Sequence, residues 1–265
     1  MNVEGSRVTV VGGSIAGCAA AIALQRLGAD VQVFERSSGA LHDRGSGIAI
    51  PLALRDELIG ADYLRADYPT CVAARRHWVV ADGTDDGRLL WRQTGAAAMS
   101  NWGVLWRSLR AGVPDDRYHD GTIVRRVAPR DDHVEITLDD GATARTDVLI
   151  GADGYHSTVR EIVAGDARPH YAGYILWRGN FPESRLADRT AIDRLDADEA
   201  WLTVAFDGGH AVMYPIPDFD DGVAPGERRI NWAIYAAQPT ALRLDGPSSI
   251  PPGAVAEDVH AALPR

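Results

Sequence analysis

The residues with the clearest chemical meaning are a run of glycines and one carboxylate near the N-terminus. The run Gly12-Gly-Ser-Ile-Ala-Gly17 follows a short β-branched stretch, and Glu35 follows a second one. Glycines permit a tight turn, backbone N–H groups at a helix N-terminus bind a pyrophosphate, and a carboxylate accepts hydrogen bonds from ribose hydroxyls. Ser14 stands where this pattern has its second glycine, so its hydroxyl would either displace the phosphate or bind it. The spacing predicts a dinucleotide site; the competing interpretation is a strand–helix turn without a ligand.

Three elements must position these residues. The β-branched run at residues 7–11 predicts a buried strand, the Ala/Leu-rich residues 15–27 predict a helix that ends at Gly28, and residues 31–34 predict a second strand. Together they have the order and approximate length of a βαβ unit.

The rest of the chain divides into a mixed part and a strand-rich part. A helical segment is predicted around residues 52–58, a hairpin at 76–80 and 88–91, and a helix at 104–111. Three strands at 122–127, 133–138 and 144–150 predict an antiparallel meander whose last strand enters the main sheet, and a helix follows Gly154 to about residue 164. Strands at 174–181, 201–206, 210–216 and 229–236 predict an antiparallel sheet rich in Trp and Tyr.

Composition narrows the class of partner. The 265 residues carry a net charge of −10 with no basic run, which argues against nucleic acid and anionic membranes as main partners. Cys18 and Cys71 are predicted to be plain thiols, and no zinc-type Cys/His spacing occurs, so we predict no metal. Without a recognisable signal sequence or membrane span, the expected location is cytoplasmic.

Three segments together resemble the flavoprotein aromatic hydroxylases, the class of p-hydroxybenzoate hydroxylase. They are the Gly12–Gly17 turn with Glu35, the loop Arg44-Gly-Ser-Gly47, and Asp147-Val-Leu-Ile-Gly-Ala-Asp-Gly-Tyr-His-Ser-Thr-Val-Arg160, of which the last is the most specific. The resemblance implies an α/β fold: an FAD-binding Rossmann-like domain of the glutathione-reductase type with an inserted antiparallel-sheet substrate domain. Residues 1–70 and 101–168 would form the FAD-binding domain and 71–100 and 169–240 the sheet domain. Residues 241–265 would be a tail that stops before the family's Gly-Asp motif.

The resemblance also implies the cofactor contacts. FAD would be held by Gly12, Gly13, Ser14, Ile15, Ala16, Gly17, Glu35, Arg36, Arg44, Gly45, Arg107, Asp153 and Gly154. Arginine and a helix N-terminus converging on two phosphates would give charge-assisted hydrogen bonds. For Arg44 and Arg107 the competing interpretation is an exposed, solvated side chain.

The strand-rich part looks like the dihydroxypyridine hydroxylase branch, through Tyr171–Gly179, Gly209-His210 and Tyr214–Pro217. Trp177 and Tyr214 would line one wall of a flat aromatic pocket. Arg178, Tyr214 and His210 would be the catalytic residues that bond a phenolate or ring nitrogen. The alternatives are that Trp177 and Tyr214 are sheet core, that Arg178 is a structural ion-pair partner, and that His210 serves a turn.

The chemistry implied by the resemblance is oxygen transfer. NADH or NADPH would reduce FAD, O₂ would add to give a flavin C4a-hydroperoxide, and the distal oxygen would pass to a small aromatic or N-heteroaromatic ring. A homodimer is left open. The competing functions are an NAD-dependent dehydrogenase or another flavin oxidoreductase, and an inactive or partner-completed flavin-fold fragment. The fragment is considered because residues 246–265 contain no Gly-Asp segment to complete the FAD site.

Overall fold

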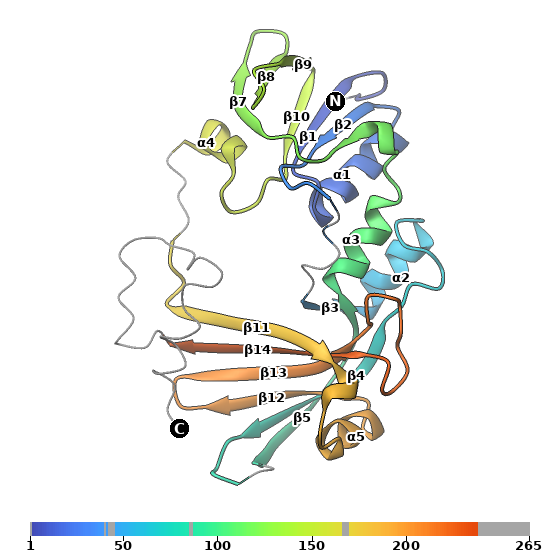
Figure 1. Cartoon of the computed structure of the whole chain (residues 1–265), viewed down its shortest axis with the longest axis vertical. Helices are drawn as coiled ribbons and strands as arrows, with labels where there is room; N and C mark the ends of the chain where they lie inside the picture. Colours follow the sequence, from blue (N-terminus) through green and yellow to red (C-terminus); the bar gives the residue numbers. More distant parts are fainter. Residues whose placement is uncertain (1, 40, 42–45, 85–86, 166–169, 238–265) are drawn as a thin grey trace.

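The computed structural model describes residues 2–39, 41, 46–84, 87–165 and 170–237 (Figure 1). In Figure 1 a parallel sheet with its helices occupies the upper part of the molecule, and a long, mostly antiparallel sheet occupies the lower part. The mixed α/β fold class predicted from the sequence is confirmed.

The upper sheet has four parallel strands in the order β10-β1-β2-β6. Their bounds are Val148–Gly151, Arg7–Val11, Asp30–Phe34 and Tyr118–His119. Val8, Val10 and Val33 are almost fully buried, as expected of parallel strands covered on both faces. The predicted βαβ unit is therefore confirmed, and β6 is a two-residue addition that sequence periodicity did not indicate.

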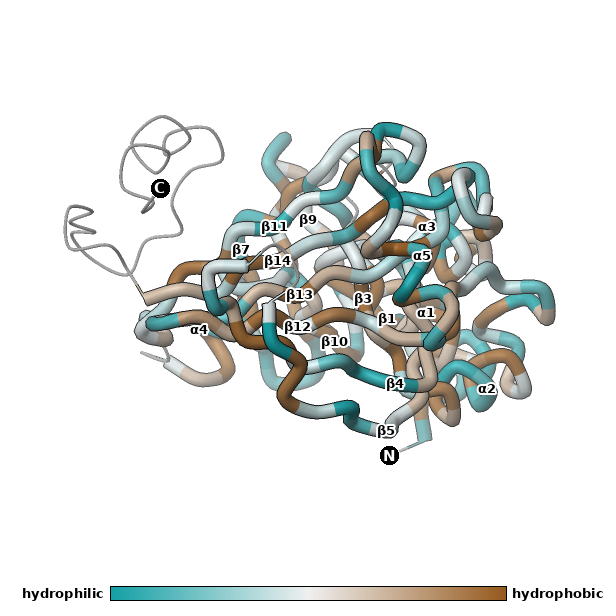
Figure 2. Tube along the Cα trace, turned by 90° about the horizontal axis from the view of Figure 1, so that it is seen from below, coloured by the Kyte–Doolittle hydropathy of each residue, from teal (hydrophilic) through white to brown (hydrophobic). Residues whose placement is uncertain are grey.

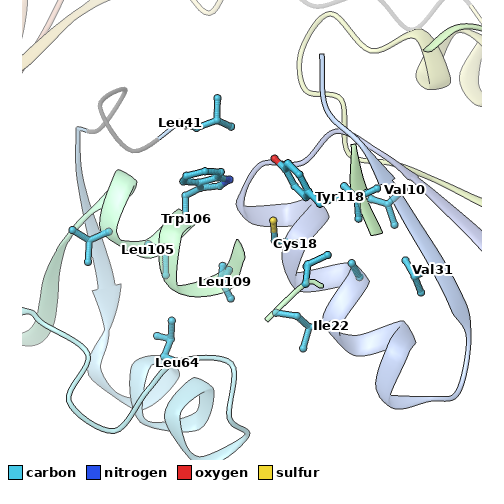
Figure 3. Close-up of a cluster of buried hydrophobic side chains, with 14 of the residues drawn as sticks. Val10, Cys18, Ile22, Val31, Leu41, Leu64, Leu105, Trp106, Leu109 and Tyr118 are labelled. Carbon is cyan, nitrogen blue, oxygen red and sulfur yellow. The ribbon is translucent and has the colours of Figure 1, made fainter. Parts of the chain in front are cut away.

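Two helices pack beside this sheet and share one core. They are α1 (Ile15–Arg26) and α3 (Trp102–Arg110). Cys18 and Ile22 of α1 lie against Leu109 and other buried side chains of α3 (Figure 3). Helix α1 ends where Gly28 takes the left-handed conformation, with φ +82°, which confirms the predicted stop.

A small antiparallel sheet, β7-β8-β9, stands at the top of Figure 1. Its strands are Val124–Pro129, Val134–Leu138 and Thr143–Thr146, and α4 (Thr158–Ala164) follows β10. The single strand predicted at 144–150 is in fact two strands, β9 and β10, separated at Asp147. The Asp147 carboxylate accepts from the Arg7 backbone N–H at 2.8 Å and from Arg7 Nη2 at 2.8 Å, so Asp147 marks the crossover into the parallel sheet.

The lower sheet has seven strands in the order β11-β14-β13-β12-β4-β5-β3. All neighbours are antiparallel except β12 and β4, which run parallel. In the same order, the strands are Tyr174–Pro182, Arg229–Ala237, Gly209–Ile216, Ala200–Phe206, Cys71–Val80, Arg88–Asn101 and Gly47–Pro51. The four strands expected from the Trp/Tyr-rich part are confirmed.

The two faces of the lower sheet differ in what covers them. We call the face that packs against α5 (Thr190–Ala197) the outer face; Ile192 and Leu195 of α5 meet Ile230 there. We call the opposite face the inner face. At the inner face the Gly47 N–H donates to Asn231 Oδ1 at 2.6 Å. The start of β3 therefore lies over the inner face of the sheet.

Three further elements belong to the described chain: α2 (Leu52–Gly60), η2 (Asp115–Arg117) and η3 (Glu183–Arg185). Helix α2 was predicted, whereas α5, β3 and the two 3-10 turns were not. Cys18 and Cys71 are free, buried thiols, as predicted. In the described residues, no helix has the length and apolarity needed to cross a membrane.

Candidate cofactor site

A cavity of about 740 Å³ opens at the carboxyl ends of β1, β2 and β10. That volume is typical of a cofactor or substrate site, and the carboxyl edge of a parallel sheet is where such sites lie. Its lining includes eight predicted site residues: Gly12, Ser14, Ala16, Glu35, Arg36, Asp153, Gly154 and Arg178. Val124 and Arg125 of β7, in the small sheet, also line it, as do Thr122 and Ile123 just before that strand. The cavity is thus bordered by all three sheets.

The glycines of the turn are needed by the protein's own packing. Gly12 has φ +103°, and a Cβ placed on it would lie 2.3 Å from the Ala152 carbonyl oxygen. A Cβ on Gly17 would lie 1.8 Å from the Gly12 carbonyl oxygen. Larger residues at these positions would therefore separate the turn from β10 and from α1. Such close packing is the ordinary role of glycines in a phosphate-binding turn.

The turn is also held from behind through the carbonyl of Gly13. Trp106 Nε1 and Tyr118 Oη each donate to this oxygen at 2.9 Å, and Cys18 Sγ lies 3.3 Å from it. The three side chains come from α3, β6 and α1 and meet in one buried group (Figure 3). Burial is the main cause that raises the pKa of both Cys18, to about 12, and Tyr118, so both groups keep their protons at neutral pH. The turn is therefore pre-formed.

The N-terminus of α1 is open toward the cavity. Ser14 is the N-cap residue, yet in the described chain its side chain makes no capping hydrogen bond, and the first turn holds no acidic residue. The first N–H groups of α1 and the positive end of its dipole are then available to an anion. Ser14 and Ala16 both line the cavity at this point.

Glu35 is buried at the end of β2 and lines the same cavity. Its carboxylate accepts from the backbone N–H groups of Gly13 and Ser37, each at 2.8 Å. A carboxylate has about four acceptor positions, so these two bonds orient it and leave capacity for hydroxyl donors. This is the chemistry that a ribose requires.

Asp153 and Gly154 lie on the opposite side of the cavity, and Asp153 also caps α4. Its Oδ1 accepts from Ser157 Oγ at 2.5 Å and its Oδ2 from the Thr158 N–H at 2.8 Å. Ser157 in turn accepts from the Arg160 N–H at 2.9 Å. The Val159 N–H is a third, longer donor to Asp153 Oδ2, at 3.3 Å, so the Asp-Gly segment is a rigid edge of the cavity whose carboxylate already has three local partners.

The other predicted cofactor residues do not all lie at the cavity. Arg36 lines the cavity, and Gly13, Ile15 and Gly17 belong to the turn behind it. Arg107 does not join the lining: its Nη1 donates to the Phe219 carbonyl at 2.7 Å, and its Nη2 pairs with Asp221. Its guanidinium holds the 218–222 loop against α3. Arg44 and Gly45 lie outside the described residues.

The predicted wall made of Trp177 and Tyr214 is wrong. The ladder register places Tyr214 opposite Asn231, and Asn231 opposite Asn180. Trp177 is three positions from Asn180, and because side chains alternate along a strand, Trp177 projects from the outer face while Tyr214 projects from the inner face. The two aromatic side chains are separated by the sheet.

The three predicted catalytic residues share the inner face. Arg178 lies two positions from Asn180 and His210 four from Tyr214, so both project on the same side as Tyr214. Only Arg178 reaches the lining of the large cavity. Burial raises the pKa of Tyr214 to about 12, with Tyr235 adding to the shift and Arg178 opposing it, so Tyr214 remains a protonated donor at neutral pH.

Several lining residues carry no sequence motif. Arg125 and Thr122 reach the cavity because the Thr122 N–H donates to the Glu35 carbonyl at 2.9 Å, which draws the start of β7 beside β2. Trp102 reaches it because its N–H donates to the Ser46 carbonyl at 3.0 Å. Only knowledge of this chain pairing could have indicated them.

A second cavity of about 200 Å³ lies between β4 and α5 and is lined by Cys71, Asp196 and Arg228 among others. Arg228 donates to both oxygens of the buried Glu183, at 2.8 and 2.9 Å, and pairs with Asp196 at 2.6 Å. Its charge is fully used within the protein, so this smaller cavity offers a ligand little.

Comparisons with known proteins match both parts of the chain. Residues 7–58 match the family model for pyridine nucleotide-disulphide oxidoreductases, and residues 171–243 match the model described as FAD binding domain-like. The chain is 30% identical over 237 residues to 2,6-dihydroxypyridine 3-monooxygenase of Paenarthrobacter nicotinovorans, and the matched region covers 89% of this chain. It is 30% identical over 261 residues to 3-amino-4-hydroxybenzoate 2-monooxygenase of Streptomyces cremeus, covering 92% of this chain.

A similar solved structure is that of 2,6-dihydroxypyridine-3-hydroxylase from Arthrobacter nicotinovorans. It superimposes with a TM-score of 0.75 and 27% identity over 92% of this chain and 58% of the solved one. The chain spans 56% and 60% of the lengths of the two relatives named above.

Proposed function

Because the chain belongs to the family of FAD-dependent aromatic hydroxylases, we propose that it binds FAD and serves an NAD(P)H-dependent monooxygenase that hydroxylates a small aromatic or N-heteroaromatic ring. The observation that carries the proposal is the open N-terminus of α1, which faces a cavity of about 740 Å³ together with Glu35. An uncapped helix end, a buried acceptor and a volume of this size are what a dinucleotide needs.

The residues present fit FAD. The α1 N–H groups with Ser14 would hold the pyrophosphate, and Glu35 would accept from the ribose of the adenosine. Arg36 would add positive charge near that end. When bound, the flavin would supply the oxygen-transfer chemistry, while the protein's residues bind, orient and exclude water.

The inner face of the lower sheet would hold the ring to be hydroxylated. Arg178 lines the large cavity and also projects from this face, so it would stand where cofactor and substrate meet. Tyr214, protonated at neutral pH, would donate to a ring oxygen or nitrogen. We further propose the division in which residues 1–70 and 101–168 bind the cofactor and residues 71–100 and 169–240 bind the substrate.

The test begins with the visible absorption of the purified chain after incubation with FAD and desalting. A retained flavin band supports the cofactor assignment, and its absence contradicts it. NADH and NADPH oxidation with a panel of hydroxylated benzenes and pyridines, followed by mass spectrometry of the product, then tests the reaction. A gain of one oxygen atom in the ring supports a monooxygenase, whereas oxidation without ring product contradicts it.

The competing proposal is that these residues are a flavin-fold fragment that turns over only when a partner completes it, or not at all. It predicts weak FAD retention that a second polypeptide strengthens.

A further inference from the structure

The inner face of the lower sheet carries one continuous row of five residues across five strands. The registers pair Trp78 of β4 with Thr203, Thr203 with Val212, Val212 with Ala233, and Ala233 with Arg178 of β11. Neighbouring strands lie about 4.8 Å apart, so the row is roughly 19 Å long between its terminal Cα atoms. An arginine at one end and an indole at the other enclose small side chains in the middle.

The rows on either side rise above Val212 and Ala233. On one side His210 stacks on Tyr235, with ring centroids 4.6 Å apart and planes 9° apart. On the other side stand Tyr214 and its partner Asn231. A low strip of valine and alanine between aromatic and amide side chains is a surface on which a flat ring can lie.

Arg76 stands at the end of this row that is far from Arg178. It pairs with Trp201, and Trp78 lies two positions along β4, so Arg76 also projects from the inner face. Its Nε donates to Thr203 Oγ1 at 2.7 Å, and its Cζ lies 4.0 Å from the centre of the Trp78 ring. Figure 2 shows that β4 turns hydrophilic in this middle stretch.

The environment of Arg76 is unusual for a half-buried cation. Burial is the main cause that lowers the pKa of Arg76. Among the described residues its guanidinium has one hydrogen bond, to the neutral Thr203, and no carboxylate partner. Within the part of the chain that the structure describes, both Nη atoms are therefore free, and their planar fork matches a carboxylate. Arg228, which is also buried, contrasts with it because Glu183 and Asp196 neutralise its charge.

We propose that Arg76 is a specificity-determining residue that binds the carboxylate of an aromatic acid whose ring lies over Val212 and Ala233. This inference rests on the proposed function, since it places the substrate on the inner face. The names of the relatives include both a benzoate and a pyridine without a carboxylate, so Arg76 is the feature of this chain that decides between them. Thr203 and Trp78 hold the guanidinium in place, which lowers the entropy lost when the acid binds.

The test uses two matched probe pairs: 4-hydroxybenzoate with phenol, and 6-hydroxynicotinate with 2-hydroxypyridine. Binding to the full chain is measured by isothermal titration calorimetry, with and without FAD. We expect each acid to bind at least tenfold more tightly than its neutral partner. Arg76→Met should remove this preference and leave the neutral probes within about twofold of their original affinity. Arg76→Lys should restore part of it, because the charge remains and the planar fork is lost.

Arg75→Met is the matched control. Arg75 is exposed, neighbours Arg76 in β4, and donates to the Asp198 carbonyl at 2.7 Å. This variant removes the same charge and should keep the preference for acids. Circular dichroism melting checks the fold of each variant. If Arg76→Met fails to fold, Arg76→Gln, which can still donate to Thr203, replaces it.

Two outcomes overturn the inference: a wild-type chain that binds acids no more tightly than neutral rings, or an Arg76→Met variant that keeps the preference. Flavin retention is scored separately. A chain that binds acids through Arg76 and retains no FAD supports this inference while contradicting the cofactor assignment. A chain that retains FAD and shows no preference for acids supports the cofactor assignment and contradicts the role of Arg76.

Discussion

Glu35 is the residue on which the cofactor assignment depends most directly. Glu35→Ala should weaken FAD binding by about 1–3 kcal/mol, because charge-assisted bonds to the ribose are lost. Part of the loss would come from the turn, since the Gly13 and Ser37 N–H groups lose their acceptor. Quenching of flavin fluorescence during titration measures the affinity. Glu57→Ala, at an exposed position of α2, is the control and should bind FAD as the wild type does.

Gly12 gives a second prediction at the scale of one residue. Gly12→Val should abolish flavin retention, because φ is +103° and the new Cβ would approach the Ala152 carbonyl within 2.3 Å. The turn would have to separate from β10, which moves the α1 N-terminus away from Asp153. Absorption at the flavin band after desalting reports the loss. Gly60→Ala, where a Cβ meets nothing within 4 Å, should retain flavin, and retention by Gly12→Val would show that the turn tolerates the shift.

At the scale of elements, one buried ion pair joins η3 to the start of β14. Glu183 is fully buried and accepts two bonds from Arg228. Arg228→Met should lower the free energy of unfolding by about 3–5 kcal/mol, because it removes two charge-assisted bonds from a buried carboxylate and leaves it only the half-buried Arg189 as a cationic partner. Urea denaturation measures the change. Arg185→Met, in the same segment but exposed, should change stability by less than about 0.5 kcal/mol.

The same junction predicts a pH dependence. Burial alone would raise the pKa of Glu183, but its bonds from Arg228, Gly226 and Arg189 outweigh burial and lower it. A carboxyl whose folded pKa is lowered contributes stability above its unfolded pKa of about 4.3, and that contribution is lost as pH falls through the folded pKa. In Arg228→Met the bonds from Arg228 are gone and burial favours the neutral acid. The stability difference between wild type and variant should therefore narrow as pH falls below about 4; a constant gap would contradict this account.

The elements that could be predicted from the sequence are those with a strong local pattern. Apolar periodicity with a turn residue at the ends marks β1, β2 and α1. It also marks β11, β12, β13 and β14, the four strands of the lower sheet that come from the Trp/Tyr-rich part of the sequence. Strands β3 and β6 could not be predicted, because they are short and exist only through their pairing with β5 and β2. The break at Asp147 depends on Arg7, which is 140 positions away.

In the candidate site too, the residues set by local sequence pattern could be predicted, and those set by long-range strand pairing could not. The turn at Gly12 and the carboxylate at Glu35 lie within one βαβ unit, so their spacing predicted their meeting. The side of the sheet from which Trp177 projects depends on ladder register, which a one-residue shift reverses. Arg76 was not predicted for a related reason: only the register of β4 against β12 brings it to the inner face with Thr203.

At the scale of the whole molecule, the large cavity is lined by residues from three sheets. Glu35 comes from the parallel sheet, Arg125 from the small antiparallel sheet and Arg178 from the lower sheet. A ligand that fills the cavity therefore contacts all three sheets at once. At 100 times its dissociation constant, FAD should raise the free energy of unfolding by about 2.7 kcal/mol. Thermal melting with increasing FAD tests this increase.

Comparing ADP with FAD separates two questions: whether a ligand binds at the turn, and whether the bound ligand extends as far as Arg178. ADP contains the adenosine and pyrophosphate that the α1 end would hold, but lacks the flavin that would approach Arg178. We expect both ligands to slow amide hydrogen exchange in the turn at residues 12–17, and only FAD to slow exchange in β11. Protection of β11 by ADP would mean that the lower sheet responds to closure of the turn alone. If FAD slows exchange in the turn and leaves exchange in β11 unchanged, the flavin lies away from Arg178. The catalytic assignment of that arginine would then be wrong.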